Sequence, residues 1–231
     1  MKPALSQITP LLYEFEWKSA ISDTLLQRQL SFRSKLQQAF SKEILELRMG
    51  FKTLAFVLGR PIAAKELSQW LASLTLEETL LTLPEKIWQI PVCYSDETGR
   101  DLATLSKAKN ISKEELIFHH TQPLYRLHFY GFLPGFMYLS GLSEMLHSPR
   151  KSVPDRAVPA GSVAIGADQT GIYPSVSPGG WHLIGQTPTR LFDPNQTIPV
   201  FAEPGERIEF IPISVLEYDL LKRHPNPPNF R

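Results

Sequence analysis

The chain carries GFLPGFMYLSGL at 131–142, VPAGSVAIGADQTGIYP at 158–174 and SPGGWHLIGQTPTRLFD at 177–193. These three segments interleave glycine, proline and aromatic residues. Glycine is selected where the backbone needs a positive φ or a close approach, and proline where φ must be fixed. Such a mixture is typical of rigid, shaped loops rather than of a solvated linker. We therefore predict that the functional site lies between residues 131 and 193.

Turn-forming residues divide the chain into two parts. Residues 1–120 hold 3 of the 13 glycines and 5 of the 20 prolines, and residues 121–231 hold the remainder. A helix-rich first part therefore gives way to a turn-rich second part. The sequence predicts two domains with bounds 1–84 and 85–231.

The first domain shows alternating helical and strand periodicity. Strands are predicted around Tyr13–Trp17, where apolar residues alternate, and at 43–48 and 51–58. Helices are predicted after Ser22, a typical N-cap residue, and over 67–74. This β-α-β-β-α order indicates a small α+β sandwich of ferredoxin-like type that lacks its last strand.

The second domain reads as a series of short strands with two short helices. Ser112 and Glu115 stand at capping-box spacing at the start of the second helix. Strands are predicted at 87–94, 125–130, 162–167, 182–186 and 207–213, separated by turn residues. This pattern favours a closed or nearly closed β-barrel, although periodicity by itself leaves a sandwich open.

Composition excludes several classes of protein. With 42% hydrophobic residues, 20% charged residues and a net charge of +1, the chain has no basic field for nucleic acid or anionic lipid. Pro3, Pro10, Glu14 and Glu16 interrupt the start of the chain, and no window approaches 18 apolar residues. We expect a cytoplasmic protein with neither nucleic acid nor membrane as a partner. Cys93, the single cysteine, is expected in the core.

Common cofactor motifs are missing from the sequence. It contains no GxxxxGK[ST], GxGxxG, HExxH or CxxC. His119 and His120 are adjacent, so their side chains diverge on a helix or a strand, and we predict no metal site. ATP has no recognisable binding motif in this chain.

The SPGGW segment contains the first candidate binding residues. Gly179 and Gly180 have no side chains to cover the backbone, so their amides would be available to a carboxylate or a developing oxyanion. Trp181 would supply a flat apolar wall. We include Ser177 of the same segment among the substrate-binding candidates. The alternative is a tight turn before a strand, with the tryptophan in the core.

Four further polar residues are candidates for the same site. Arg150 offers a planar guanidinium suited to an anionic group, or it is an ordinary surface charge. Gln169 and Tyr173 bracket the turn at 170–171 and would place an amide and a phenol on one side of a loop, unless they only form a hairpin and pack. His119, late in a helix, is the first candidate for a general acid or base, ahead of His128. Phe132 and Phe136 are assigned to packing or to the pocket wall.

The motifs in these segments resemble one protein family along much of the chain. The chain resembles the family of the 5-oxoprolinase B subunit, which also contains the kinase-inhibitor proteins of sporulation signalling and the first subunit of allophanate hydrolase or carboxyltransferase systems. The resemblance rests on Gly131–Leu142, Arg150, Val158–Ile165, Gln169–Pro174, Ser177–Trp181, Gly185–Pro188 and Leu191–Asp193. Two details depart from it: Ala167-Asp168 replaces a glycine-containing turn, and the usual Gly-Asp-Ala start is missing from Ile8–Trp17.

The resemblance implies a fold and a function. It implies a cyclophilin-like barrel for the second domain and a histidine near the position of His119. Similar proteins act in the ATP-dependent opening of 5-oxo-L-proline to L-glutamate, so this chain would be a hydrolase subunit that is inactive alone. Its partners would be a second barrel-type subunit of the C type and an ATP-using subunit of the A type. A sensor-kinase inhibitor and a carboxyltransferase subunit served by a biotinylated partner remain alternatives.

Overall fold

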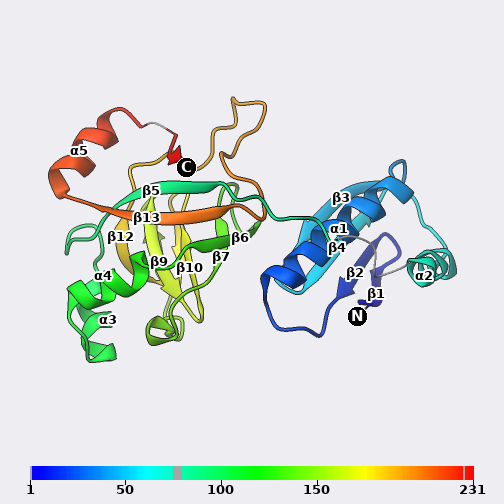
Figure 1. The fold of residues 1–231 in the computed structure, drawn as a ribbon, viewed down its shortest axis with the longest axis horizontal. Coiled ribbons are helices and arrows are strands. Elements are labelled where there is room, and N and C mark those ends of the chain that lie inside the picture. The colour runs from blue at the N-terminus through cyan, green and yellow to red at the C-terminus, as the bar shows by residue number, and fades with distance from the viewer. Residues whose placement is uncertain (1, 75–79, 226) are drawn as a thin grey trace. The chain divides into compact units, whose positions relative to one another are not determined.

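The computed structural model describes residues 2–74, 80–225 and 227–231, and it divides into two compact units, Met1–Leu83 and Pro84–Arg231 (Figure 1). The predicted boundary between residues 84 and 85 lies one residue away from this division. Each unit has its own hydrophobic core.

The first unit is a four-stranded antiparallel sheet with two helices. Its elements are β1 (Ala4–Thr9), β2 (Leu12–Glu16), α1 (Asp23–Ala39), β3 (Ile44–Met49), β4 (Thr53–Leu58) and α2 (Ala64–Ser73). Along the chain, the elements from β2 to α2 form the predicted β-α-β-β-α series. Within the sheet, the strand order is β1-β2-β4-β3. The edge beside β2, which the last strand of a ferredoxin-like unit would occupy, is taken by β1.

Local sequence explains most of this unit. Ser22 caps α1 by accepting a hydrogen bond from the backbone amide of Leu25. Phe15 of β2 lies fully buried against Phe32 of α1 and Phe56 of β4, at ring-centroid distances of 4.7 Å and 5.4 Å. Strand β1 was not predicted, because five of its six residues are exposed and it has no apolar alternation.

The second unit is a closed β-barrel. Hydrogen bonding joins its strands in the order β12-β9-β10-β7-β6-β13-β5, and β5 pairs back to β12, so the described part of the chain forms a seven-stranded ring. The strands are β5 (Ile87–Cys93), β6 (Tyr125–Tyr130), β7 (Met137–Ser140), β9 (Ser162–Gly166), β10 (Gln169–Ile172), β12 (His182–Gln186) and β13 (Arg207–Ile213). The barrel prediction is confirmed, and the sandwich alternative is excluded.

Short elements surround the ring. Strand β14 (Asn229–Phe230) adds to the edge of β5, and β8 (Asp155–Val158) pairs with β11 (Ser177–Gly179) outside the ring. Inside the barrel, strands contribute alternate residues such as Ile90, Val92 and Leu127, each fully buried. Cys93 is also buried and is a free thiol, as predicted.

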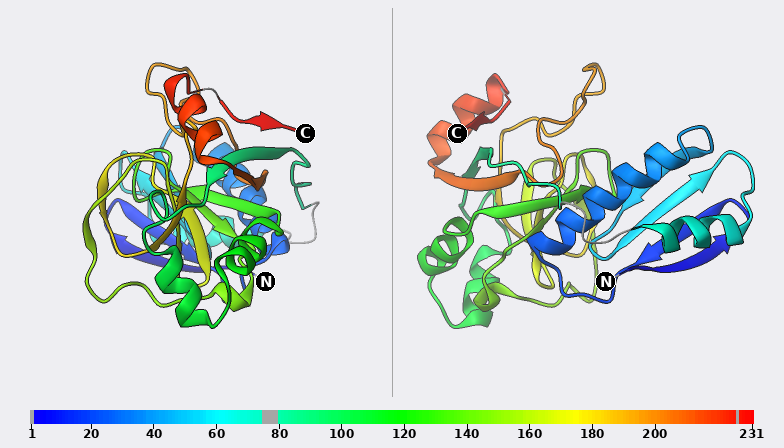
Figure 2. Two further views of the ribbon diagram at one scale, coloured as in Figure 1. Left: turned by 90° about the vertical axis from the view of Figure 1, so that its left-hand side faces the viewer. Right: turned by 45° about the vertical axis from the view of Figure 1, so that its right-hand side comes forward.

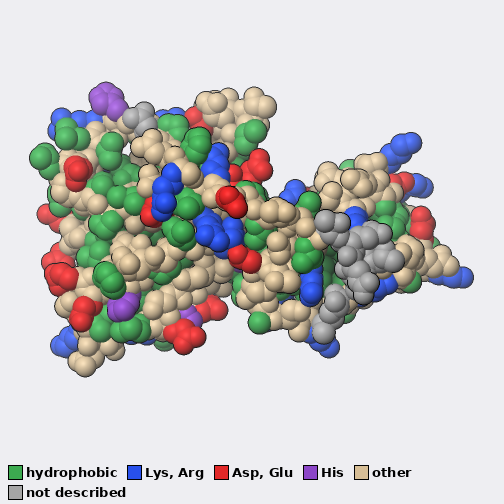
Figure 3. Space-filling view, in the orientation of Figure 1, with side chains coloured by type: hydrophobic (Ala, Val, Ile, Leu, Met, Phe, Trp, Pro, Cys, Tyr) green, Lys and Arg blue, Asp and Glu red, His purple; other side chains and the backbone are tan. Residues whose placement is uncertain are grey.

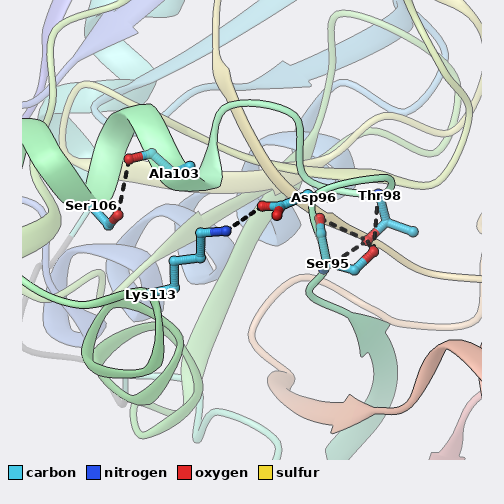
Figure 4. A network of polar contacts seen from close by, with 6 residues as sticks. All are labelled: Ser95, Asp96, Thr98, Ala103, Ser106 and Lys113. Atoms are coloured by element: carbon cyan, nitrogen blue, oxygen red, sulfur yellow. Dashed lines mark hydrogen bonds and ion pairs between the residues drawn. The ribbon is translucent and has the colours of Figure 1, made fainter.

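Three helices pack on the outside of the barrel. Helices α3 (Leu102–Lys109) and α4 (Lys113–Thr121) lie together on one side, and α5 (Val215–Arg223) lies above β5 (Figures 1 and 2). The predicted capping box of α4 is present, since Ser112 and Glu115 exchange both hydrogen bonds. Figure 4 shows how the turn before α3 is held: the Thr98 hydroxyl interacts with Ser95, and Lys113 of α4 pairs with Asp96.

The surface agrees with the near-neutral composition. The face shown in Figure 3 carries acidic and basic side chains near one another rather than a field of one sign. Among the described residues, no helix combines the length and apolar character needed to cross a bilayer.

Candidate functional site

A pocket of about 280 Å³ opens on the barrel unit beside the β8–β11 pair. Its walls come from the three glycine- and proline-rich segments of the sequence and from the residues around Arg150. The lining residues are Phe132, Phe136, Tyr138, Arg150, Lys151, Pro154, Tyr173, Pro178, Gly179, Gly180 and Trp181. The chain therefore brings segments that are up to 50 residues apart into one concave surface.

Aromatic rings form the floor and walls of this pocket. Phe136 lies edge-on to Tyr173 at 5.3 Å and to Trp181 at 5.6 Å, measured between ring centroids. Tyr138 packs on Phe136 at 5.1 Å. Phe136, Tyr173 and Trp181 are each at least 95% buried, so these three walls are preformed rather than mobile.

Glycines allow this aromatic cluster to close. A Cβ atom at Gly179 would lie 2.3 Å from the Tyr173 hydroxyl, and one at Gly166 would lie 2.5 Å from the Trp181 ring. Gly179 therefore makes room for Tyr173, whereas the nearest atoms to a Cβ at Gly180 are 3.7 Å or more away.

Two cations stand side by side at the pocket, and only one of them is neutralised. Lys151 Nζ lies 2.6 Å from Asp101 Oδ2 and 2.8 Å from Asp155 Oδ2. Burial acts to raise the pKa of Asp155, but its contacts with Lys151 and Arg100 outweigh this effect and lower it. Lys151 is thus fully balanced by carboxylates.

Arg150 differs from Lys151 because no carboxylate of the described residues pairs with it. Its guanidinium lies over the ring of Trp181, 5.7 Å from the centroid, and its side chain is exposed. Burial raises the pKa of Tyr138 and of Tyr173, and the Arg150 charge opposes both shifts. The site therefore combines one uncompensated cation with two neutral phenols, which suits a small anion that also has a hydrogen-bond acceptor.

Five of the eight predicted site residues line the pocket: Arg150, Tyr173, Gly179, Gly180 and Trp181. The predicted turn at 170–171 is wrong, because Gln169–Ile172 forms β10 and the turn to β9 lies at 167–168. Gln169 begins β10 opposite Gly166 and does not line the pocket. Ser177 begins β11 opposite Val158 and is 93% buried, and its hydroxyl has no hydrogen-bond partner in the structure. It lies next to the lining residue Pro178 but is not itself part of the wall.

His119 lies apart from this group of residues. It is partly exposed near the end of α4, where its ring contacts Phe118, and it does not line the pocket. Its neighbour His120 is fully buried and packs on Phe210 at 4.7 Å. His128 is buried on β6 and bonds to the hydroxyl of Ser140. None of the three is among the residues that face the pocket.

The buried His120 orders a chain of hydrogen bonds. Its Nε2 atom lies 2.8 Å from the Thr170 hydroxyl, which donates to the carbonyl of Ala164, so Nε2 is the protonated nitrogen. Nδ1 then accepts from the Tyr94 hydroxyl at 2.8 Å. Burial lowers the pKa of His120 to about 3, consistent with a neutral imidazole that links α4 to Tyr94, the residue after β5, and to Thr170 of β10.

Several pocket residues were missed by sequence reasoning. Tyr138, Lys151, Pro154 and Pro178 were not predicted as site residues, and Phe132 was assigned only to packing or to a wall. Tyr138 lies in the same GFLPGFMYL segment as Phe132 and Phe136, and this shared segment is the sequence signal that could have identified it as a pocket residue. Lys151 is neutralised in part by Asp101, which is 50 residues away in the sequence, and sequence spacing does not reveal such an ion pair.

Two other pockets lack this combination of charge and aromatic walls. One of about 290 Å³ is lined mainly by prolines and aliphatic residues around Pro91 and Pro188. Another of about 410 Å³ contains Arg190, but that cation pairs with Asp193 at 3.0 Å. Within the described ranges, no group of three His, Cys, Asp or Glu residues is arranged to hold a metal ion.

Comparison with known proteins adds an independent result. Residues 4–202 match the family model described as carboxyltransferase domain, subdomain C and D. The chain is 41% identical over 186 residues to the 5-oxoprolinase B subunit of Haemophilus influenzae, covering 80% of this chain and 86% of that protein. It is 38% identical to the 5-oxoprolinase B subunit of Escherichia coli O157:H7, covering 73% and 78% respectively.

A solved structure supports the fold. The urea amidolyase of Kluyveromyces lactis superposes with a TM-score of 0.79 at 16% identity, covering 98% of this chain and 16% of that one. At this identity the likeness concerns the fold alone. On the matched residues and these relatives, the chain belongs to the carboxyltransferase C and D family, whose members include the 5-oxoprolinase B subunits.

Proposed function

We propose that this chain is the B-type component of a 5-oxoprolinase, which opens the lactam ring of 5-oxo-L-proline to give L-glutamate. Two relatives that the chain matches over most of their length bear the name of that component. In the net reaction water is added across the lactam C–N bond, and ATP hydrolysis drives the step. The proposed role of this chain is to bind and orient the substrate.

The observation that carries the proposal is the pairing of Arg150 with an aromatic pocket. 5-Oxoproline is a small ring with one carboxylate and one amide carbonyl. Arg150 has no carboxylate partner among the described residues and stands over Trp181, so it is available to the substrate carboxylate. The neutral phenols of Tyr138 and Tyr173 are the donors that we assign to the carbonyl.

We propose that ATP is used on a partner. The sequence has no recognised nucleotide motif. The complex would then need a second barrel-type subunit of the C type and an ATP-using subunit of the A type, and it would act in the cytoplasm. The chain alone would not turn over.

Reconstitution tests this division of labour. The three chains are combined with ATP and 5-oxoproline, and glutamate release is measured, together with mixtures that each omit one chain. We expect turnover only from the complete mixture. Lack of turnover by the complete mixture would refute the function, and robust turnover by this chain with ATP alone would refute the dependence on partners.

A further inference from the structure

We infer that Phe132 is a specificity-determining residue of this pocket, and that the ring of a small cyclic carboxylate packs against it while the carboxylate is held at Arg150. This inference rests on the proposed function and assigns a new residue within it. It derives from the backbone conformation, the exposure and the position of Phe132.

The backbone at Phe132 adopts a conformation that a bulky side chain disfavours. Its φ angle is +64°, in the left-handed region where glycine is the usual residue. The loop is fixed by hydrogen bonds from the amide of Leu133 to the carbonyl of Gly131, at 2.7 Å, and from Phe136 to Leu133, at 3.0 Å. Phenylalanine is thus held in place by its surroundings at a position where glycine would be less strained.

Packing inside the protein does not account for the phenylalanine. Its side chain is 60% exposed, so most of its apolar surface contributes little to folding. The ring touches Phe136 and Tyr173 edge-on, at centroid distances of 5.5 Å and 6.3 Å, and it lines the pocket. Strained residues cluster at active sites and ligand clamps, and Phe132 combines its strained backbone with a place in the pocket wall.

The other pocket groups define the ligand class. Phe136, Tyr173 and Trp181 are buried, so Phe132 is the most exposed aromatic wall and offers a bound ring its apolar surface, beside the smaller exposed surfaces of Pro154 and Pro178. Arg150 supplies one uncompensated positive charge, and Lys151 is neutralised by Asp101 and Asp155. A volume of about 280 Å³ fits a compact molecule with a single anionic group rather than a long chain.

The test uses the assembled three-chain complex and measures KM and kcat for 5-oxoproline. Phe132→Gly removes the ring and relieves the strained backbone. We expect KM to rise about threefold to tenfold, the range that one aromatic contact contributes, with kcat changed less than about twofold. The Tm of the variant should stay within about 3 °C of wild type, because lost packing and relieved strain oppose one another. Phe132→Tyr keeps the ring and should restore KM to within about twofold.

Phe118→Ala is the matched control, because Phe118 is 56% exposed on α4 and does not line the pocket. Its KM should equal that of wild type. The inference is overturned if Phe132→Gly leaves KM unchanged, or if its only effect is looser association with a partner subunit. It is also overturned if Tm falls by more than about 10 °C, since Phe132 would then be structural. A wild-type complex without turnover would remove the proposed function itself, which is a distinct result.

Discussion

The two neighbouring glycines of the SPGGW segment should differ in their tolerance of an added methyl group: alanine should destabilise the protein at Gly179 and be tolerated at Gly180. At Gly179 a Cβ atom would lie 2.3 Å from the Tyr173 hydroxyl and 2.7 Å from its Cζ atom. Tyr173 is 2% exposed and is wedged against Phe136, so its ring cannot move aside freely. At Gly180 the nearest atoms are 3.7 Å away, an ordinary contact distance.

The expected magnitudes follow from these distances. Overpacking a rigid core costs about 1–3 kcal/mol, so Gly179→Ala should lower the Tm of the barrel unit by roughly 3–10 °C. Gly180 has no positive φ, so alanine fits there, and the change in unfolding free energy should stay within about 1 kcal/mol. Both variants replace glycine with alanine at adjacent positions, so the added group and the net charge are the same in the two proteins.

Calorimetric unfolding of the two variants and the wild type provides the measurement, with KM determined in the assembled complex. Gly179→Ala should also raise KM, because Tyr173 forms one wall of the pocket. Equal Tm values for the two variants would show that the Tyr173 contact does not restrict Gly179. A larger KM effect at Gly180 than at Gly179 would instead support the role first predicted for these glycines, the exposure of backbone amides to substrate.

Three further predictions use the same preparations. Arg150→Ala should lower kcat/KM about tenfold to a hundredfold with little change in Tm. Arg150→Lys should recover only part of the lost kcat/KM, because lysine lacks the bidentate guanidinium. Unchanged kinetics in Arg150→Ala would show that Arg150 is an ordinary surface charge. Ala167 lies in the β9–β10 turn at φ +58°, a conformation that favours glycine. Ala167→Gly should therefore raise the free energy of unfolding by roughly 0.5–1 kcal/mol, and a lower value measured by denaturant unfolding would contradict this. Burial lowers the pKa of His120 from 6.5 to about 3 in the folded state, so as the pH falls the unfolded state binds the proton first. The contribution of His120 to the free energy of unfolding is therefore complete above pH 6.5 and should be lost toward pH 3, by up to about 1.4 kcal/mol per pH unit. His120→Leu should lose this component of the pH slope and be less stable at pH 8, since Tyr94 and Thr170 lose their partner; an unaltered slope in urea titrations would assign it to other groups.

Local signals were sufficient for much of the fold. The Ser22 cap and the Ser112–Glu115 capping box each depend on residues three positions apart, and both are present. Strand β6 is present as predicted, with its first four residues buried. The strands that were missed have weak local patterns. Strand β1 is exposed at five of its six residues, and β11 comprises three residues of a glycine- and proline-rich segment, so only tertiary pairing defines them. The short strands β7, β8, β10 and β14 were also not predicted. Helix α5 was not predicted, although Ser214 and Glu217 form a complete capping box at its start.

The pocket was predictable as a region and less so in detail. Glycine, proline and aromatic residues marked the correct segments, because shaped loops need those residues wherever they occur. The partners of each residue were not predictable. Whether Arg150 or Lys151 carries the uncompensated charge depends on Asp101, a residue brought close only by the fold. His119 was preferred to His128 as the acid/base candidate, and His120 was considered only for metal binding, although it is His120 that the fold encloses in a hydrogen-bonded chain.

The closure of the barrel has a consequence for how the second unit exchanges with solvent. Strand β13 pairs with β5 over seven residues, but β12 meets β5 at the single pair Gln186–Cys93, while β14 covers Trp88 and Gln89. Pro91, which has no amide hydrogen, lies between these two points and lines the 290 Å³ pocket there. Strand β10 also meets β7 at a single register pair, Thr170–Leu139. Ladders this short open at low free energy, so deuterium should enter the barrel along these two seams before it enters the seven-residue ladder between β5 and β13. The ring is therefore closed in its average structure, but we expect it to open locally at its shortest ladders on the timescale of hydrogen exchange.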